Sequence, residues 1–435
     1  MRPYVSSIIV ALSLAMNWTC AAPPNVVMII GDDQGWGDYG FMGHPHIRTP
    51  HLDGLAKQSL LFRHGYVPSS LCRPSLASMI TGLYPHEHKI TSNDPPLPKG
   101  KTGAAANKDP QFLAQRQEMI AYIDKAPTLP RLLEKRGYLS FQAGKWWEGN
   151  HCRCGFTDGM THGDPARGGR HGDEGLKIGR QGLTEVLTFL DSARAKGKPF
   201  YLWYAPMMPH SPHNPPEALL KRYTGKVASL HVARYWAMCE WFDETCGALL
   251  KYLDDHKLAE NTIVVFICDN GWIQDPDSAN YGPRSKRSPY DGGIRTPIMI
   301  RWPGHAAARV HDEPVSSIDL APTILHAAGI PPAEVMTGVN LLAAEGVARR
   351  DAVFGAIFEH NAVDIHKPAA NLQYRWVVSS GWKLIDPAPR LGANAKPELY
   401  EISKDPYEKS DLSGRNPERL KTLRNRLNQW WLGAD

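Results

Sequence analysis

Acidic and amide side chains directly follow two apolar stretches of this sequence. Asp32 and Asp33 come after the first stretch, and Asp269 and Asn270 come after a later one. Together they offer four oxygen-bearing side chains, a ligand set that suits a hard cation such as Ca²⁺ or Mg²⁺. One aspartate alone would usually be a helix cap or a turn residue. Two such clusters in equivalent places favour a metal site, with Ca²⁺ as the expected ion and Mg²⁺ as the alternative.

A cysteine lies just before a proline in the segment 69–82 (SSLCRPSLASMITG). Pro74 suits the first position of a helix, where no backbone N–H is needed, and the N-terminus of a helix favours anionic groups. Taken alone, Cys72 would be a packing residue, because free cysteines are among the most buried side chains. The residues that lie near Cys72 decide whether it is a packing residue or takes part in a reaction.

The elements that must position these residues alternate between short apolar strands and helices. Continuous apolar runs are typical of parallel strands covered on both faces. The alternation predicts an α/β fold, a large mixed and mostly parallel sheet sandwiched by helices. Ligands of such sheets bind beyond the carboxyl ends of the strands, so the polar clusters are expected at one edge. The predicted strands are 25–31, 199–205, 261–268 and 296–302, and the predicted helices are 128–136, 231–253 and 317–328.

The character of the sequence changes near residue 350. Alternating strands and one amphipathic helix predict a small α+β subdomain over 346–435, packed on a catalytic domain over 23–345. Its predicted elements are strands within 374–385 and 398–402 and a helix at 416–431.

A series of short segments resembles the motifs of the sulfatase family, in the alkaline-phosphatase superfamily. The resembling segments are 31–38 (GDDQGWGD), 72–76 (CRPSL) with TG at 81–82, 144–146 (GKW), 209–212 (PHSP), 266–271 (FICDNG), 286–297 (KRSPYDGGIRTP) and 398–406 (ELYEISKDP). Each match is weak alone, but their order along the chain is specific. The resemblance implies an alkaline-phosphatase-like fold and the hydrolysis of sulfate esters.

The resemblance also implies a role for each site residue. Cys72 would be oxidised to formylglycine by a formylglycine-generating enzyme, and its hydrated aldehyde would be the nucleophile. A divalent ion on the four oxygen ligands would polarise the sulfate. Lys145 and Lys286 would neutralise the other sulfate oxygens, and His210 would protonate the leaving alcohol. The alternatives are solvated surface lysines and a loop-capping histidine, with His213 as a rival to His210.

Two positions depart from the family pattern. The arginine expected four residues after the cysteine is Leu76, and the histidine expected after Gly-Lys-Trp is Trp147. The arginine normally supports the nucleophile and is read by the cysteine-oxidising enzyme, while the histidine takes a proton from the nucleophile. Glu148 or His151, in the following loop, would be the substitutes for that histidine.

The N-terminal residues differ from the rest of the 435-residue chain. Residues 1–22 combine an early arginine, a short apolar core and small residues before a cleavage point, which predicts a signal peptide and a secreted or periplasmic protein. After that segment no run of apolar residues is long enough to span a membrane. The sequence contains no block of Lys and Arg with interleaved aromatic residues, so a nucleic-acid partner is not expected.

The remaining cysteines suggest packing rather than a metal. Cys239, Cys246 and Cys268 lie in apolar runs, where core packing is the expected role. Cys152 and Cys154 are too close together, and lack a second pair at zinc spacing.

Three functions fit these patterns. The first is an exported sulfatase that acts on a sulfated carbohydrate, because the Gly-, Pro- and His-rich segments 91–125 and 147–178 resemble binding loops. The second is a phosphoesterase or phosphonate hydrolase on the same fold, since phosphate and sulfate esters share tetrahedral geometry. The third is a catalytically silent paralogue that binds sulfated glycans, which the changes at Leu76 and Trp147 favour.

Overall fold

The computed structural model describes residues 22–163 and 169–434. The predicted signal peptide lies outside the described residues, except for residue 22. Within the described ranges, no helix combines the length and the apolar character needed to cross a membrane.

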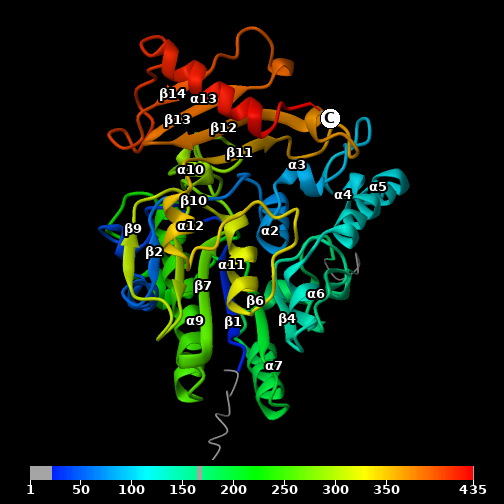
Figure 1. Ribbon diagram of the computed structural model, residues 1–435, viewed down its shortest axis with the longest axis vertical. Coiled ribbons are helices and arrows are strands. Elements are labelled where there is room, and N and C mark those ends of the chain that lie inside the picture. Colours follow the sequence, from blue (N-terminus) through cyan, green and yellow to red (C-terminus); the bar gives the residue numbers. More distant parts are fainter. Residues whose placement is uncertain (1–21, 164–168, 435) are drawn as a thin grey trace, which may run out of the picture.

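An eight-stranded sheet forms the centre of the larger part of the molecule (Figure 1). Its strand order is β5-β4-β6-β1-β7-β8-β2-β9, and β1 lies parallel to both β6 and β7. The fold is therefore the mixed, mostly parallel α/β sheet that the apolar runs predict. The strands are β1 (Asn25–Gly31), β2 (Leu60–Phe62), β4 (Leu139–Gly144), β5 (Asp158–Gly159), β6 (Phe200–Ala205), β7 (Thr262–Cys268), β8 (Ile298–Arg301) and β9 (Arg309–His311).

The predicted strand at 296–302 does not run parallel to its neighbours. β8 is antiparallel to both β7 and β2. After β7 the chain forms a long loop with only the short helix α10 (Asp291–Ile294) and then re-enters the sheet. A parallel return would need a crossover to the other end of the sheet, usually made by a helix. An apolar run alone does not contain that information.

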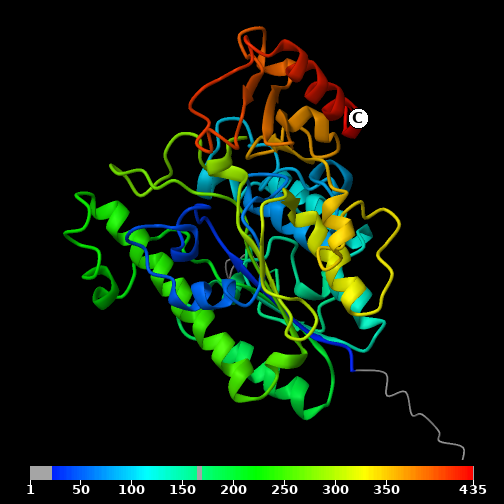
Figure 2. The ribbon, with the colours of Figure 1, turned by 60° about the vertical axis from the view of Figure 1, so that its left-hand side comes forward.

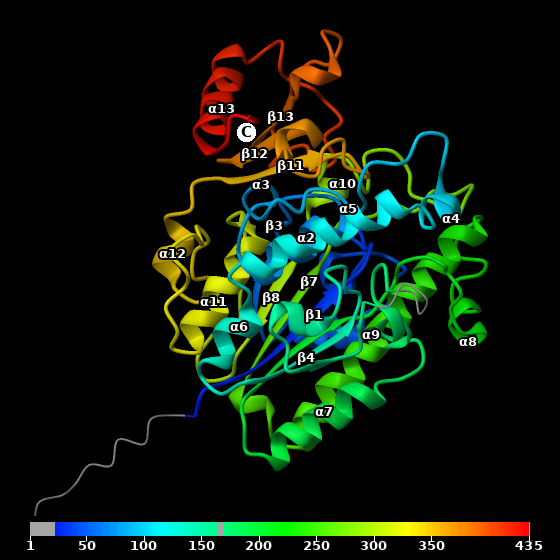
Figure 3. The ribbon, with the colours of Figure 1, turned by 90° about the vertical axis from the view of Figure 1, so that its right-hand side faces the viewer.

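Helices cover both faces of the sheet, as Figure 3 shows for α7 and α9 on one side and α6 and α11 on the other. The buried side chains accordingly form two large apolar clusters, one on each face. On one face lie α2 (Cys72–Thr81), α6 (Leu129–Glu134) and α11 (Leu320–Ala327). On the other lie α1 (Pro50–Ala56), α7 (Thr184–Ala195) and the 26-residue α9 (Leu230–Asp255).

The segment 91–125, expected to be irregular, contains a regular helix. α5 (Pro110–Ile120) begins at Asp109, whose side chain accepts hydrogen bonds from the N–H groups of Gln111 and Phe112. An aspartate N-cap followed by proline at the first helical position is a strong start signal. The sequence contains it, although the segment lacks a continuous apolar stripe. The remaining short helices are α3 (Pro85–His88), α4 (Gly103–Ala106), α8 (Glu217–Leu220) and α12 (Ala344–Ala348).

A separate four-stranded antiparallel sheet forms the C-terminal part, shown at the top of Figures 1 and 2. One side of it packs against α13 through Leu423 and Leu427. A two-stranded pair, β3 (Gly65–Tyr66) and β10 (Val315–Ser316), lies in the larger part. The C-terminal elements are β11 (Val353–Phe358), β12 (Leu372–Ser379), β13 (Trp382–Pro387), β14 (Glu398–Tyr400) and α13 (Pro417–Trp430).

Candidate active site

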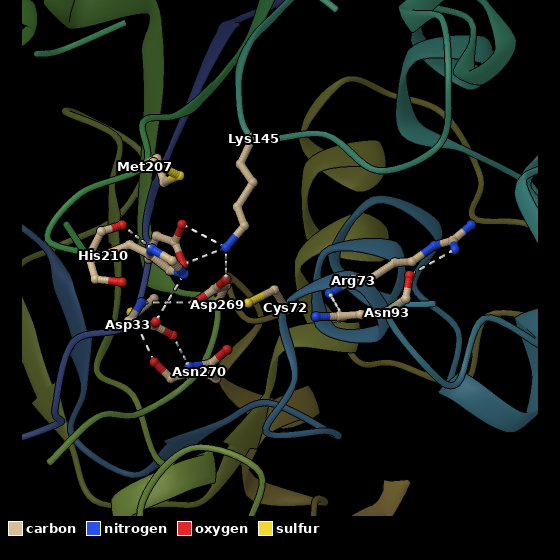
Figure 4. Close-up of polar contacts among 12 residues, drawn as sticks. Asp33, Cys72, Arg73, Asn93, Lys145, Met207, His210, Asp269 and Asn270 are labelled. Atoms are coloured by element: carbon tan, nitrogen blue, oxygen red, sulfur yellow. Dashed lines mark hydrogen bonds and ion pairs between the residues drawn. The ribbon is translucent and has the colours of Figure 1, made fainter. Parts of the chain in front are cut away.

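The polar residues singled out in the sequence lie together at the carboxyl ends of β1, β4, β6 and β7 (Figure 4). The N-terminus of α2 faces the same point, because Lys286 reaches both Asp33 and Cys72. The residues brought together are Asp32, Asp33, Cys72, Lys145, His210, Asp269, Asn270 and Lys286.

One half of the centre is built around Lys145, directly after β4. Its Nζ lies 2.7 Å from both carboxylate oxygens of Asp32 and 3.8 Å from Oδ2 of Asp269. The Lys145 side chain is only 2% exposed. Burial disfavours a charged lysine, but Asp32 and the neighbouring acidic groups outweigh it and raise the pKa of Lys145. Lys145 therefore remains a cation inside the protein.

The other half of the centre is built around Asp33. Lys286 Nζ lies 2.6 Å and 2.8 Å from the two carboxylate oxygens of Asp33, and 3.1 Å from Cys72 Sγ. The Asn270 side chain donates to Asp33 at 2.7 Å, and His210 Nε2 lies 3.3 Å from the same carboxylate. Asp33 itself has φ 64°, a left-handed conformation that aspartate tolerates better than most residues.

The two neighbouring aspartates Asp32 and Asp269 have opposite pKa shifts. Burial opposes the ionisation of Asp32, but Lys145, His210 and Lys286 together hold its pKa below the usual value. Burial raises the pKa of Asp269, and the negative charge of Asp32 raises it further. Asp269 therefore lacks enough positive charge around it to ionise easily.

The oxygen atoms at this point fit a divalent cation. Asp269 Oδ2 and Asn270 Oδ1 are buried and have no hydrogen-bond partner among the described residues. Unsatisfied buried oxygens are costly, and a cation beside Asp269 would supply the missing positive charge. Oxygens of Asp32, Asp33, Asp269 and Asn270 are the donor type that Ca²⁺ and Mg²⁺ take.

Cys72 begins α2 and is 2% exposed. Burial raises the pKa of its thiol to about 12, although Lys145 and Lys286 oppose the rise. The thiolate is the reactive form of cysteine, so an unmodified Cys72 would be a poor nucleophile near neutral pH. The helix begins two residues earlier than expected, which places Pro74 third in the helix, still within the first turn, where the N–H groups lack intrahelical partners.

The two positions that depart from the family pattern have defined structural roles. Leu76 is 3% exposed and belongs to the apolar cluster around α2. Arg73 does not replace the missing arginine, because its guanidinium bonds both oxygens of Glu148, at 2.8 Å and 2.7 Å, and points away from the centre in Figure 4. Because both oxygens of Glu148 bond Arg73, Glu148 is not free to replace the missing histidine. The other suggested substitute, His151, places its Nδ1 3.0 Å from the carbonyl oxygen of Thr161.

The structure draws attention to a different histidine, His171. Its ring lies 5.2 Å from the ring of Trp147, and its carbonyl accepts a hydrogen bond from the N–H of Trp146 at 3.0 Å. Its Nδ1 is buried without a hydrogen-bond partner within the described ranges. Burial and, to a smaller extent, the charge of Lys145 lower the pKa of His171 to about 3. Residue 171 belongs to no recognisable motif and lies only in a His-rich segment, so the sequence did not single it out.

Of the two candidate histidines near the proline-rich loop, His210 is the one at the centre. Its Nδ1 lies 2.6 Å from the carbonyl oxygen of Ser211 and its side chain is 24% exposed. Burial lowers the pKa of His210, against the pull of Asp32 and Asp33. The rival His213 packs against Tyr235 and Trp272.

Comparison with known proteins assigns the chain to a family. A family model described as Sulfatase matches residues 24–330, and a model described as N-sulphoglucosamine sulphohydrolase, C-terminal, matches residues 279–431. The chain therefore belongs to the sulfatase family.

Three similar proteins illustrate the extent of the match. Human N-acetylgalactosamine-6-sulfatase is 31% identical over 74% of this chain, which spans only 65% of that protein's length. Human arylsulfatase A is 29% identical, with 95% of this chain and 89% of that protein covered. The crystal structure of Ps i-CgsB has a TM-score of 0.73 at 24% identity and covers 95% of this chain and 94% of its own, a likeness of fold.

Proposed function

We propose that the protein hydrolyses sulfate esters of a carbohydrate. The observation that carries the proposal is the burial of Lys145 and Lys286 beside the aspartate cluster and Cys72. Two lysines and a helix N-terminus, together with a cation that offsets the charge of the aspartates, would suit a tetrahedral anion. The name of the relative N-acetylgalactosamine-6-sulfatase supports a sulfated sugar as the substrate class.

Two groups would complete the site. A divalent cation, Ca²⁺ or Mg²⁺, held by Asp32, Asp33, Asp269 and Asn270, would supply polarisation of the sulfate oxygens. Formylglycine at residue 72 would supply a nucleophilic hydroxyl in place of the buried thiol, whose pKa of about 12 keeps it protonated. Its formation requires a formylglycine-generating enzyme, and the predicted signal peptide would direct the protein out of the cytoplasm.

The chain's own residues then divide the work by charge and position. Lys145 and Lys286 bind and orient the sulfate and neutralise its oxygens. His210, whose side chain is 24% exposed, holds the proton for the departing alcohol. The family carries a histidine at the position of Trp147, and the imidazole of His171, which lies beside Trp147, would take its place.

The second candidate function is a silent protein that binds sulfated glycans. Leu76 and Trp147 favour it, because both positions hold apolar side chains in place of the family's arginine and histidine. Such a protein would retain Lys145 and Lys286 for binding the sulfate but leave Cys72 as a thiol.

Peptide mass spectrometry across residue 72, on protein from its natural source, separates the two. Loss of the sulfur with gain of one oxygen and loss of two hydrogens supports the sulfatase, and the peptide with buried Cys154 is the internal control. Aryl sulfate and aryl phosphate are then compared as substrates at equal leaving-group pKa. An intact thiol at residue 72, with no hydrolysis of a panel of sulfated saccharides, would favour the silent protein, and faster aryl phosphate hydrolysis would favour a phosphoesterase.

A further inference from the structure

Two arginine side chains, Arg116 and Arg170, meet at the carboxylate of Asp94. Arg170 bonds Asp94 with two nitrogens, Nε at 3.1 Å and Nη2 at shorter range, and its guanidinium lies 4.6 Å over the ring of Trp147. Arg116 binds the same carboxylate at 3.1 Å. Two guanidinium groups therefore share one carboxylate, and one of the two positive charges has no acidic partner of its own among the described residues.

Several contacts place this arginine group next to the centre. Trp147 comes two residues after Lys145, and Gly172 packs so closely on the carbonyl oxygen of Gly144 that a Cβ there would lie 3.1 Å from it. Asn93, beside Asp94, accepts a hydrogen bond from the N–H of Arg73 at 3.1 Å, at the start of α2. The loops that carry Asp94 and Arg170 therefore flank Cys72 and Lys145.

A second cation, Arg287, lies on the same side. It follows Lys286 directly, it is exposed, and its N–H bonds the carbonyl oxygen of Ser70 at 2.9 Å. Arg287 has φ 66°, a left-handed conformation that costs free energy for a residue with a Cβ. Among the described residues its guanidinium has no hydrogen bond or ion pair; nearby Glu359, whose pKa its charge helps to lower, pairs with Arg390 at 2.6 Å.

His360 senses the charges of Arg170, Arg287 and Asp94. Its carbonyl oxygen accepts a hydrogen bond from the N–H of Asn93 at 3.0 Å. Burial lowers the pKa of His360, and the charges of Arg287 and Arg170 lower it further. Both arginines are thus within electrostatic range of one ring, and this ring carries no negative charge to balance them.

We propose that Arg170 and Arg287 bind a second anionic group, a carboxylate or another sulfate, on the saccharide whose sulfate ester enters the centre. The inference rests on the proposed function, since it names the substrate class of the same site. Arg170 is held rigidly by Asp94 on one edge and Trp147 on one face, while its Nη1 has no partner among the described residues. A guanidinium fixed in this way loses little freedom on binding an oxyanion.

Binding is measured by calorimetry on the full chain with Cys72→Ala, so that turnover plays no part. The probes are a monosulfated disaccharide with no other charged group, a disulfated disaccharide, and a monosulfated disaccharide that contains a uronate. At least one doubly anionic probe should bind about tenfold or more tightly than the singly charged one, and the preference should shrink with added salt. Whichever of the disulfated and the uronate-containing probes binds more tightly identifies the second anion as sulfate or carboxylate.

Arg170→Met and Arg287→Met, each added to Cys72→Ala, should reduce this preference to within about threefold. Arg153→Met is the matched control, because Arg153 has the same 31% exposure as Arg170 and the same two-nitrogen pairing, with Asp124 on the outer surface. It should keep the preference. Arg170→Lys retains the positive charge but not the paired N–H groups of the guanidinium. It shows whether the loop needs a cation at this position in order to fold.

Equal binding of all three probes, or an unchanged preference in both arginine variants, overturns the inference. The proposed function fails separately: protein that prefers doubly anionic saccharides but hydrolyses none of them retains the arginine site and loses the sulfatase assignment.

Discussion

Replacement of Lys383 by methionine tests how the C-terminal sheet supports the site. Lys383 lies on β13, is fully buried, and pairs with Asp291 at 2.8 Å and Glu408 at 2.6 Å. The other oxygen of Glu408 accepts a hydrogen bond from the N–H of Asp291 at 2.7 Å. Asp291 follows the segment that carries Lys286, so this buried cluster connects the small sheet to that segment.

The cost of the substitution follows from the two carboxylates that it leaves behind. Removal of one partner from a buried ion pair typically costs about 3–5 kcal/mol. Arg295, 3.7 Å from Asp291, and Arg284, which donates to the backbone carbonyl of Glu408, remain nearby. Burial already raises the pKa of Glu408 to about 7, against the opposing charge of Lys383. Without Lys383 that pKa rises further. A raised carboxyl pKa in the folded state gives stability that is present at low pH and lost as pH rises through it.

Lys383→Met should therefore lower the free energy of unfolding by about 3–5 kcal/mol at pH 8, and by clearly less at pH 5.5, where Glu408 accepts a proton. Urea unfolding at both pH values measures it. The control is Lys251→Met, which removes a 2.7 Å pair with Asp255 from a side chain that is 73% exposed, at a cost of at most about 0.5 kcal/mol. A Lys383 variant as stable as this control, or a deficit equal at both pH values, would refute the reasoning.

Three further predictions concern the centre and the core. Ca²⁺ at one hundred times its Kd should stabilise the wild-type fold by about 2.7 kcal/mol relative to chelator, and Asp269→Asn should abolish this gain in a thermal melt. His171→Ala should lower kcat far more than it raises KM, whereas His162→Ala, an exposed neighbour, should change neither; equal effects would exclude His171. Burial raises the pKa of Asp243 to about 7, so the melting temperature should fall between pH 5 and pH 8, and Asp243→Asn should flatten that fall.

The sequence located the strands and the polar residues because both depend on local pattern. Runs of apolar residues marked β1, β6 and β7, and each was followed by the side chains that now meet at the sheet edge. The direction of β8 was predicted wrongly, since it depends on where the chain turns rather than on side-chain type. The start of α5 was present in the sequence at Asp109 and Pro110, but its helical stripe is weak.

Contacts between residues far apart in the chain could not be predicted from the sequence. Arg73 pairs with Glu148, and Arg170 pairs with Asp94, across separations of 75 and 76 residues. Neither pair has a periodic or motif signal, because each forms only when two loops meet over the finished sheet. The place of His171 beside Trp147 has the same origin.

The buried charges argue against a centre that has merely lost its function. Asp32, Asp33 and Lys145 are almost fully inaccessible, as is Asp269, whose Oδ2 lacks a hydrogen bond. Charged groups in such a place stabilise a fold less than apolar side chains of similar size would, so packing alone does not account for them. Trp147 meanwhile serves as the surface under Arg170. A protein that only bound glycans would need cationic side chains but not four buried oxygen-bearing side chains beside them, and this favours hydrolysis over silent binding.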